Sequence, residues 1–284
     1  MLEKKYEIIT RCRISKGELI DVLYLGEQPL ANSLKNNQKN SEEKFPLSIS
    51  FCEESSLLQL NETVDKEVLF DHYVWVTGTS KTTQSYANAF ADRLISNLDL
   101  KQEDFIIEIA SNDGTFLNPF LTKGYKNVLG VDPAKNIAEI ANRNGINTLQ
   151  EFWSSSLANQ IVADSGQAKV VFARNVIPHV SELLDVMRGI NFVLKDDGVG
   201  IIEFHDAGII LNELHFDSIY HEHLCYFSIK SMTYLLNRFA LHPFHIEKSP
   251  ISGGSWVIYF SKEEQQKTPD LQEAIIDENK KQMN

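Results

Sequence analysis

The chain lacks the features that mark several classes of protein. Among its 284 residues there are only three cysteines, Cys12, Cys52 and Cys225, which are too few for a disulfide framework and typical of a reducing compartment. Its apolar runs fall well short of the ~18 residues that a membrane span needs, and its charged start, MLEKKYEIITR, has no apolar signal-peptide core. These absences predict a cytoplasmic protein without a membrane partner.

Basic residues are also scarce. Lys and Arg number 27 against 39 Asp and Glu, so the net charge is -12 and the sequence pI is about 5.1. Binding to nucleic acid or to an anionic membrane needs a local excess of Lys and Arg, so neither partner is expected. With 43% hydrophobic and 23% charged residues, the chain is otherwise typical of an enzyme with one large domain and a small one.

The glycine-rich GxGxxG turn of dinucleotide-binding proteins is absent too. In its place EIASNDGTFLNPF spans residues 108–120, and the apolar run FIIEIA that leads into it predicts a buried parallel strand. The turn consists of Ser111, Asn112, Asp113 and Gly114. Gly114 lets a ligand approach the backbone closely, and the Asn and Asp tolerate unusual backbone angles. A second predicted strand, NVLGVDP, reaches Asp132, whose carboxylate suits a ribose diol.

The charge of this turn selects among ribose compounds. With a single glycine and Asp113 beside it, the turn would repel a pyrophosphate. Glu108 and Asp113 instead suit the cationic amino-acid end of S-adenosylmethionine. The turn therefore favours a methyl donor over NAD, and the alternative is an ordinary strand and turn of an α/β protein.

Changes in composition divide the chain into parts. Residues 1–81 carry short β-like runs between polar stretches, which predicts a small, loop-rich N-terminal module. Within residues 82–265 predicted strands and helices alternate as in a doubly wound sheet, so the expected fold class is α/β. The later strand candidates are KVVFARNV, GVGIIEF and SGGSWVIYF. Residues 266–284 predict an amphipathic helical tail that ends without a cap, as if the chain were cut short there.

A second group of titratable residues lies in FDSIYHEHLCYFS, residues 216–228. A histidine near neutral pKa can take a proton from a carbon next to a carbonyl, a neighbouring glutamate can fix its tautomer, and a tyrosine can hydrogen-bond the developing oxyanion. The segment therefore suits an enolisation. Two alternatives remain: His221 and His223 as an H-x-H metal pair with a third ligand from elsewhere, or polar histidines of a structured loop.

Motifs along nearly the whole chain resemble one family. They are LGEQPLANS (25–33), FDHYVWVTGTS (70–80), EIASNDGTFL, GVDPAKNIA (130–138), ARNVIPHV (173–180), DDGVGIIEF, IYHEHLCYFS and SGGS (252–255). The family is that of the S-adenosylmethionine-dependent nucleotide-sugar C-methyltransferases, which methylate C-3 of 4-keto-deoxysugars, and IYHEHLCYFS is the most specific of the motifs. The resemblance implies a Rossmann-like class I methyltransferase domain that follows a small N-terminal β module.

By position, the resemblance also implies roles for individual residues. His223 would be the general base, with Tyr220 and Glu222 as its partners in the active site. The residues that meet the acceptor would be Tyr73, Trp75 and His221. The residues that bind the donor would be Glu108, Ser111, Asn112, Gly114, Asp132 and Asn175. For the last two, a purely structural role as caps of a helix or turn is the alternative.

The chain departs from the family at its zinc site. Members usually bind zinc in the N-terminal module through two CxxC pairs, whereas the pairs here read Cys12 to Ser15 and Cys52 to Ser55. Two thiolates cannot close a tetrahedral site and neutral serine is a poor zinc ligand, so zinc is not expected. A site would need further ligands, such as His72.

Two other departures concern the acceptor. The family's YxY pattern appears as Tyr73-Val-Trp75, which lacks one hydroxyl, and the family's C-terminal domain is absent from the sequence. Three hypotheses follow. The leading one is a C-methyltransferase acting α to a ketone, with His223 as base. The others are a degenerate homologue that binds the donor without turnover, and a methyltransferase acting on a sugar hydroxyl.

Overall fold

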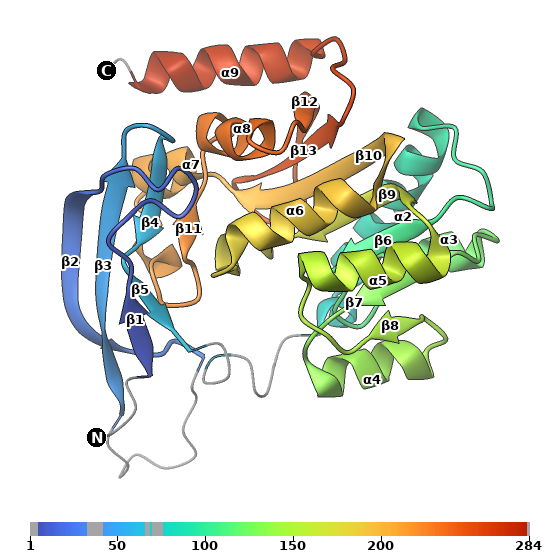
Figure 1. Ribbon diagram of the computed structural model, residues 1–284, viewed down its shortest axis with the longest axis horizontal. Coiled ribbons are helices and arrows are strands. Elements are labelled where there is room, and N and C mark those ends of the chain that lie inside the picture. Colours follow the sequence, from blue (N-terminus) through green and yellow to red (C-terminus); the bar gives the residue numbers. More distant parts are fainter. Residues whose placement is uncertain (1–4, 33–41, 66–68, 70–75, 283–284) are drawn as a thin grey trace.

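The computed structural model describes residues 5–32, 42–65, 69 and 76–282. A seven-stranded sheet forms its centre, with the strand order β12-β13-β10-β9-β6-β7-β8 (Figure 1). The strands are β6 (Ile106–Ile109), β7 (Val128–Val131), β8 (Thr148–Leu149), β9 (Ala168–Arg174), β10 (Leu194–His205), β12 (His242–Lys248) and β13 (Ser255–Ser261). The five strands from β10 to β8 are parallel, and β13 is antiparallel to both of its neighbours.

Helices cover both faces of this sheet (Figure 1). The α-helices are α2 (Lys81–Asn97), α3 (Asn118–Thr122), α4 (Lys135–Arg143), α5 (Ser155–Ser165), α6 (Leu183–Val193), α7 (Ala207–Asn212), α8 (Ile229–Asn237) and α9 (Pro269–Gln282). Short 3-10 turns are η1 (Thr77–Thr79), η2 (Ile177–His179) and η3 (Phe216–Ser218). No helix of the described residues combines the length and the apolar character that crossing a membrane requires.

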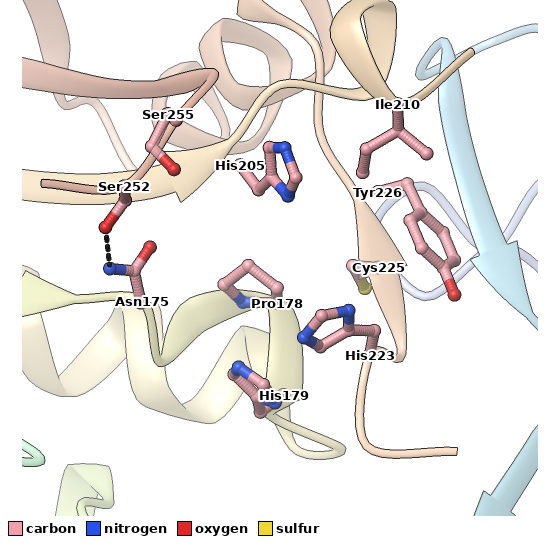
Figure 2. Close-up of a pocket in the computed structure, with 11 residues that line it drawn as sticks. Asn175, Pro178, His179, His205, Ile210, His223, Cys225, Tyr226, Ser252 and Ser255 are labelled. Carbon is pink, nitrogen blue, oxygen red and sulfur yellow. Dashed lines mark hydrogen bonds between the residues drawn. The ribbon is translucent and has the colours of Figure 1, made fainter. Parts of the chain in front are cut away.

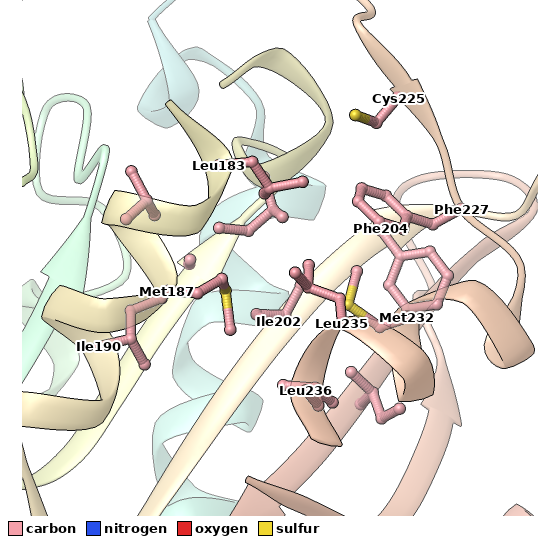
Figure 3. Packing of buried hydrophobic residues seen from close by; sticks show 14 of the residues in the cluster. Leu183, Met187, Ile190, Ile202, Phe204, Cys225, Phe227, Met232, Leu235 and Leu236 are labelled. Carbon is pink, nitrogen blue, oxygen red and sulfur yellow. The ribbon is translucent and has the colours of Figure 1, made fainter. Parts of the chain in front are cut away.

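The alternation of side chains along each strand builds two hydrophobic cores. Ile107 of β6 and Phe204 of β10 belong to the core under α5, α6 and α8, whereas Ile106 and Phe172 belong to the core under α2 and α3. Figure 3 shows the first core where Met187 and its neighbours on α6 face β10 and α8. Because both faces are covered, β6 and β7 are buried along their whole length and mostly apolar, as their sequences predict. The predicted α/β fold class is confirmed.

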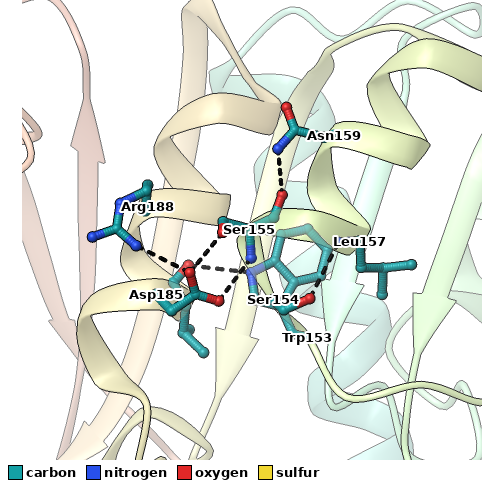
Figure 4. Close-up of polar contacts among 8 residues, drawn as sticks. Trp153, Ser154, Ser155, Leu157, Asn159, Asp185 and Arg188 are labelled. Carbon is teal, nitrogen blue, oxygen red and sulfur yellow. Dashed lines mark hydrogen bonds and ion pairs between the residues drawn. The ribbon is translucent and has the colours of Figure 1, made fainter.

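Polar contacts fix α5 against α6 (Figure 4). The Ser155 hydroxyl and backbone N–H both donate to the Asp185 carboxylate, at 2.6 and 3.0 Å, and Arg188 donates to the same group at 3.0 Å. Trp153 Nε1 donates to the carbonyl oxygen of Val186 at 3.2 Å. The hydrogen bonds from Ser155 hold the pKa of Asp185 below its usual range.

The N-terminal module consists of small antiparallel sheets. Its strands are β1 (Tyr6–Ile8), β2 (Ile20–Pro29), β3 (Lys44–Cys52), β4 (Leu57–Leu60) and β5 (Glu62–Val64). A distant segment adds a strand to it, because β11 (Cys225–Tyr226) pairs with β4. β11 begins two residues after His223, so the predicted enolisation segment lies where the module meets the central domain.

Candidate functional site

The donor turn connects β6 to α3 at the carboxyl edge of the sheet. Asn112 has a φ of 51° and Gly114 a φ of 78°, both in the left-handed region that the composition of the turn predicts. A Cβ atom on Gly114 would lie 2.4 Å from Ile146 Cδ1, so a side chain has no room there. The Asp132 carboxylate accepts the N–H of Asn112 at 2.9 Å and that of Ala134 at 3.0 Å. Asp132 thus joins the ends of β6 and β7.

The interior of this turn is acidic and partly unsatisfied. Glu108 is 3% exposed, and its Oε2 has no hydrogen-bond partner among the described residues. Burial raises the pKa of Glu108 well above its usual value, and the charges of Asp113 and Asp132 act in the same direction, while Arg174 opposes them. Burial also raises the pKa of Asp132. Such a carboxyl group is stabilised by a cationic ligand.

The turn also holds the segment that leads into α2. The N–H of Thr77 donates to Asn112 Oδ1 at 2.9 Å, and the N–H of Gly78 donates to Asp113 Oδ2 at 3.0 Å. A Cβ atom on Gly78 would lie 2.5 Å from that carboxylate oxygen, so a side chain there would displace the Asp113 carboxylate. The side chains of Asn112 and Asp113 therefore also hold the segment before α2 in place.

A cavity of about 290 Å³ lies at the carboxyl ends of β9 and β10, against residues 216–228, the HEH segment (Figure 2). Its lining includes three histidines and few other titratable groups. The lining residues are Asn175, Pro178, His179, His205, Ile210, His223, Cys225, Tyr226, Ser252, Gly253 and Ser255. The HEH segment and the carboxyl ends of β9 and β10 thus meet at one cavity.

The tautomer of His223 is set by its hydrogen bonds. Its Nδ1 lies 2.7 Å from the carbonyl oxygen of Ser218, which only accepts, so Nδ1 carries the proton. Its Nε2 then accepts the hydroxyl of Tyr220 at 2.9 Å. Burial lowers the pKa of His223 to about 4, so the ring is neutral at physiological pH. Tyr220 thus contacts His223, and the catalytic roles of both residues stay predictions.

The carboxylate of Glu222 bonds the N-terminal module and not the neighbouring His223, with which the sequence associates it. Its side-chain Oε1 accepts a hydrogen bond from Asn32 Nδ2 of the N-terminal module at 2.7 Å, and burial raises its pKa. Its backbone carbonyl accepts Nδ1–H of His179 at 2.9 Å. The Ser218 carbonyl, rather than this carboxylate, fixes the tautomer of His223. A role of Glu222 in catalysis stays a prediction.

His221 faces away from the cavity. His221 is only 2% exposed, and its ring packs on the N-terminal module. Its Nε2 lies 3.1 Å from the carbonyl oxygen of Pro46 and 3.3 Å from that of Phe45. His221 and His223 thus contact different carbonyls, and no cluster of three or more metal-ligating side chains occurs in the part of the chain that the structure describes. The predicted acceptor residues Tyr73 and Trp75, and His72, lie outside the described residues.

Asn175 lies at the cavity wall, directly after β9. It follows β9 with a φ of 49°, and its N–H donates to the carbonyl oxygen of Glu203 at 3.0 Å. Its side-chain Nδ2 donates to Glu203 Oε1 at 3.1 Å and reaches Ser252 Oγ at 3.5 Å. Glu203 is fully buried and forms an ion pair with Arg174, which lies over the Phe116 ring. This buried pair positions Asn175 at the cavity wall.

Two histidines of the cavity were not among the predicted site residues. His179 lies in η2, just after β9, and His205 is the last residue of β10. Burial, helped by the neighbouring His223, lowers the pKa of His179 to about 3, and its ring centroid lies 4.8 Å from that of His223. The rule that ligands bind at the carboxyl ends of parallel strands was the signal available in the sequence, because both residues follow predicted strands.

The four positions that correspond to zinc ligands come together in the module. Cys12 Sγ lies 3.1 Å from Ser55 Oγ, and Cys52 Sγ lies 3.4 Å from Ser15 Oγ. The N–H of Ser15 also donates to Cys12 Sγ at 3.4 Å. Two thiols and two hydroxyls do not fit a structural zinc ion, which needs four N, S or carboxylate ligands. Thiol–hydroxyl hydrogen bonds connect these positions instead.

Comparison with known proteins identifies the class. Residues 83–242, more than half of the chain, match the family described as "Methyltransferase domain", and residues 12–70 match the one described as "Putative zinc binding domain". The chain belongs to this methyltransferase family. Its Rossmann-like domain is that of an S-adenosylmethionine-dependent methyltransferase, as the sequence predicts, and the unsatisfied Glu108 and the Asp132 carboxylate fit the ammonium and ribose of that donor.

One relative in sequence and two solved structures are similar to the chain. The chain is 29% identical to the C-methyltransferase NovU of Streptomyces niveus over 254 residues, which are 88% of this chain and 60% of NovU. A protein of Pyrococcus horikoshii has the same fold with a TM-score of 0.50 and 15% identity, over 66% of this chain and 95% of its own. An S-adenosylmethionine-dependent methyltransferase of Clostridium acetobutylicum also has a TM-score of 0.50, with 11% identity over 63% of this chain and 91% of its own.

Proposed function

We propose that the protein transfers the methyl group of S-adenosylmethionine to the carbon α to the ketone of a nucleotide-linked keto-deoxysugar, with His223 as the general base. The observation that carries this proposal is the 2.9 Å contact between the Tyr220 hydroxyl and Nε2 of His223, a histidine that lines the cavity at the carboxyl ends of β9 and β10. The similarity to NovU, a C-methyltransferase, and the motifs shared with sugar C-methyltransferases support carbon rather than oxygen as the acceptor atom.

The hydrogen bonds of His223 define its part in the reaction. Because Ser218 holds the proton at Nδ1, the lone pair of Nε2 is the basic site. This lone pair takes the α proton of the acceptor, and the C–H electron pair becomes the C=C bond of an enolate. The hydroxyl of Tyr220, released from Nε2, can then donate to the enolate oxygen.

The donor supplies an electrophilic methyl group on a sulfonium, and the enolate carbon attacks it while the S–C electron pair remains on sulfur. The protonated His223 then loses its proton to solvent. Because its pKa is only about 4 in the buried cavity, His223 is a weak base, and the reaction depends on stabilisation of the enolate oxygen by nearby donors.

We also propose a division of labour along the chain. Residues 1–81 form a module that covers the acceptor site, where Tyr73 and Trp75 contact the sugar. Residues 82–265 bind the donor, and residues 266–284 form a helical tail. The support is that β11 pairs with β4 and that Glu222 and His221 both contact the module. The three free thiols suit the reducing conditions of the cytoplasm.

Deuterium exchange without the donor tests the proposed base. The purified protein, incubated in deuterated water with a nucleotide-linked 4-keto-deoxysugar, should catalyse exchange of the α proton, and His223→Ala should slow it by about 10²–10⁴. His245→Gln is the matched control, because His245 bonds Thr268 and does not line the cavity. Undiminished exchange by His223→Ala would remove His223 from this role.

A further inference from the structure

His205 lines the same cavity as His223 but has no assigned role. Its backbone is fixed because β10 pairs with β13, which places His205 opposite Ser255. In Figure 2 its ring lies across the cavity from His223, on the side of Ser252 and Ser255, with one ring nitrogen turned toward the cavity. The ring is therefore in reach of a ligand held over His223.

His205 differs from the other two histidines of the cavity in its partners. His179 and His223 each bond a backbone carbonyl through Nδ1. His205 Nε2 is buried without a hydrogen-bond partner among the described residues, and it packs against Gly254, where a Cβ atom would lie 3.2 Å from it. The cavity-facing nitrogen is thus Nδ1.

The unpartnered Nε2 also indicates where the ring carries its proton. A buried N–H without an acceptor is rarer and costlier than an unpaired acceptor, so the proton belongs on Nδ1, where a ligand can accept it. Burial and the neighbouring His215 both lower the pKa of His205, which favours the neutral ring. A neutral imidazole with its N–H toward the cavity is a hydrogen-bond donor, and no hydrogen bond occupies it within the part of the chain that the structure describes.

We infer that His205 is a second catalytic residue, whose Nδ1–H donates to the ketone oxygen of the acceptor and stabilises the enolate that forms there. This inference rests on the proposed function, which creates that negative charge. The proton of His205 stays on Nδ1 throughout, so the residue exchanges nothing with the substrate. His223 takes the α proton from one side of the cavity while His205 and Tyr220 hold the oxygen.

Donor-free deuterium exchange with the 4-keto-deoxysugar tests the inference through a graded set of variants. His205→Ala removes the N–H and should slow exchange by about 10²–10³, the usual effect of losing one oxyanion donor. His205→Asn places an amide N–H near the position of Nδ1 and should restore exchange at least about tenfold over the alanine variant. His205→Gln, whose amide corresponds to Nε2, should not. Calorimetric affinity for S-adenosylmethionine should stay at the wild-type value in all three.

The outcomes separate this inference from the proposed function. If the wild-type protein does not exchange the α proton, the proposed function falls and the role of His205 falls with it. If the wild type exchanges and His205→Ala exchanges at a similar rate, only the role of His205 is overturned. An alanine variant that is slow but not improved by asparagine, or that binds the donor more weakly, would show that the ring only supports the shape of the cavity.

Discussion

The buried carboxylate of Glu108 should lower the stability of the donor-free protein and strengthen the binding of the donor. The variant Glu108→Gln separates these two effects. The carboxyl group is buried with Oε2 unpartnered among the described residues, near Asp113 and Asp132. Glutamine has nearly the same shape and no charge. Relieving an unpaired buried charge should raise the free energy of unfolding of the donor-free protein by about 1–3 kcal/mol at pH 8. A gain of that size raises Tm by roughly 2–4 °C per kcal/mol.

The sign of the pH dependence follows from the raised pKa of Glu108. The folded state holds the carboxyl proton more tightly than the unfolded chain, whose glutamate pKa is about 4.3. The wild type therefore loses stability as the pH rises from about 4.3 toward the folded-state pKa, by about 1.4 kcal/mol per pH unit. Since glutamine does not titrate, the stability advantage of Glu108→Gln should be small near pH 4 and grow with pH.

The affinity for the donor should fall in Glu108→Gln, although the stability of the donor-free protein rises. Losing a charged acceptor for the ammonium group costs about 1.5–3 kcal/mol, which corresponds to a Kd roughly tenfold to a hundredfold higher. Thermal melts from pH 4 to 8 and calorimetry with S-adenosylmethionine measure the two effects, and Glu103→Gln, at an exposed site nearby, is the control. A variant that is less stable than wild type at pH 8, or that binds the donor equally well, would refute the reasoning.

Three further predictions concern other parts of the chain. Asp132→Ala should weaken donor binding by about 1–3 kcal/mol, measured by calorimetry, and NAD binding without donor binding would contradict the assignment. Elemental analysis should find no stoichiometric zinc in the wild type, and zinc found there would overturn this prediction. The double variant Ser15→Cys with Ser55→Cys should bind one zinc ion per chain and melt at a lower temperature after chelation. Asp185→Ala should lower the free energy of unfolding by about 1–2 kcal/mol. Because the pKa of Asp185 is depressed in the folded state, this loss should shrink as the pH falls through that pKa. An unchanged melting temperature at pH 7 would contradict the prediction.

Local chemistry made much of the donor side predictable. The short apolar run before Ser111 predicts a strand covered on both faces, and the residue types at Asn112 and Gly114 favour left-handed backbone. The order of strands and helices after residue 82 sufficed to predict the doubly wound sheet. The contact between Asn112 and Asp132 then follows from the adjacency of β6 and β7.

The acceptor side was less predictable, because its contacts join residues that are distant in sequence. Glu222 was expected beside His223, yet its carboxylate bonds Asn32, 190 residues away. No periodicity reveals such a pairing, nor the β11–β4 contact that turns His221 toward the N-terminal module. His205 was overlooked because its place at the end of a predicted strand was the only signal, and the strands that bring it to the cavity are distant in sequence.

Transfer of a labelled methyl group tests the central claim most directly. The protein is incubated with S-adenosylmethionine labelled with ¹³C in the methyl group and a nucleotide-linked 4-keto-deoxysugar, and the product is examined by ¹³C NMR. The proposed function predicts a new methyl carbon coupled to the sugar carbon next to the ketone. A methyl carbon bonded to oxygen, or donor binding without any transfer, would contradict it.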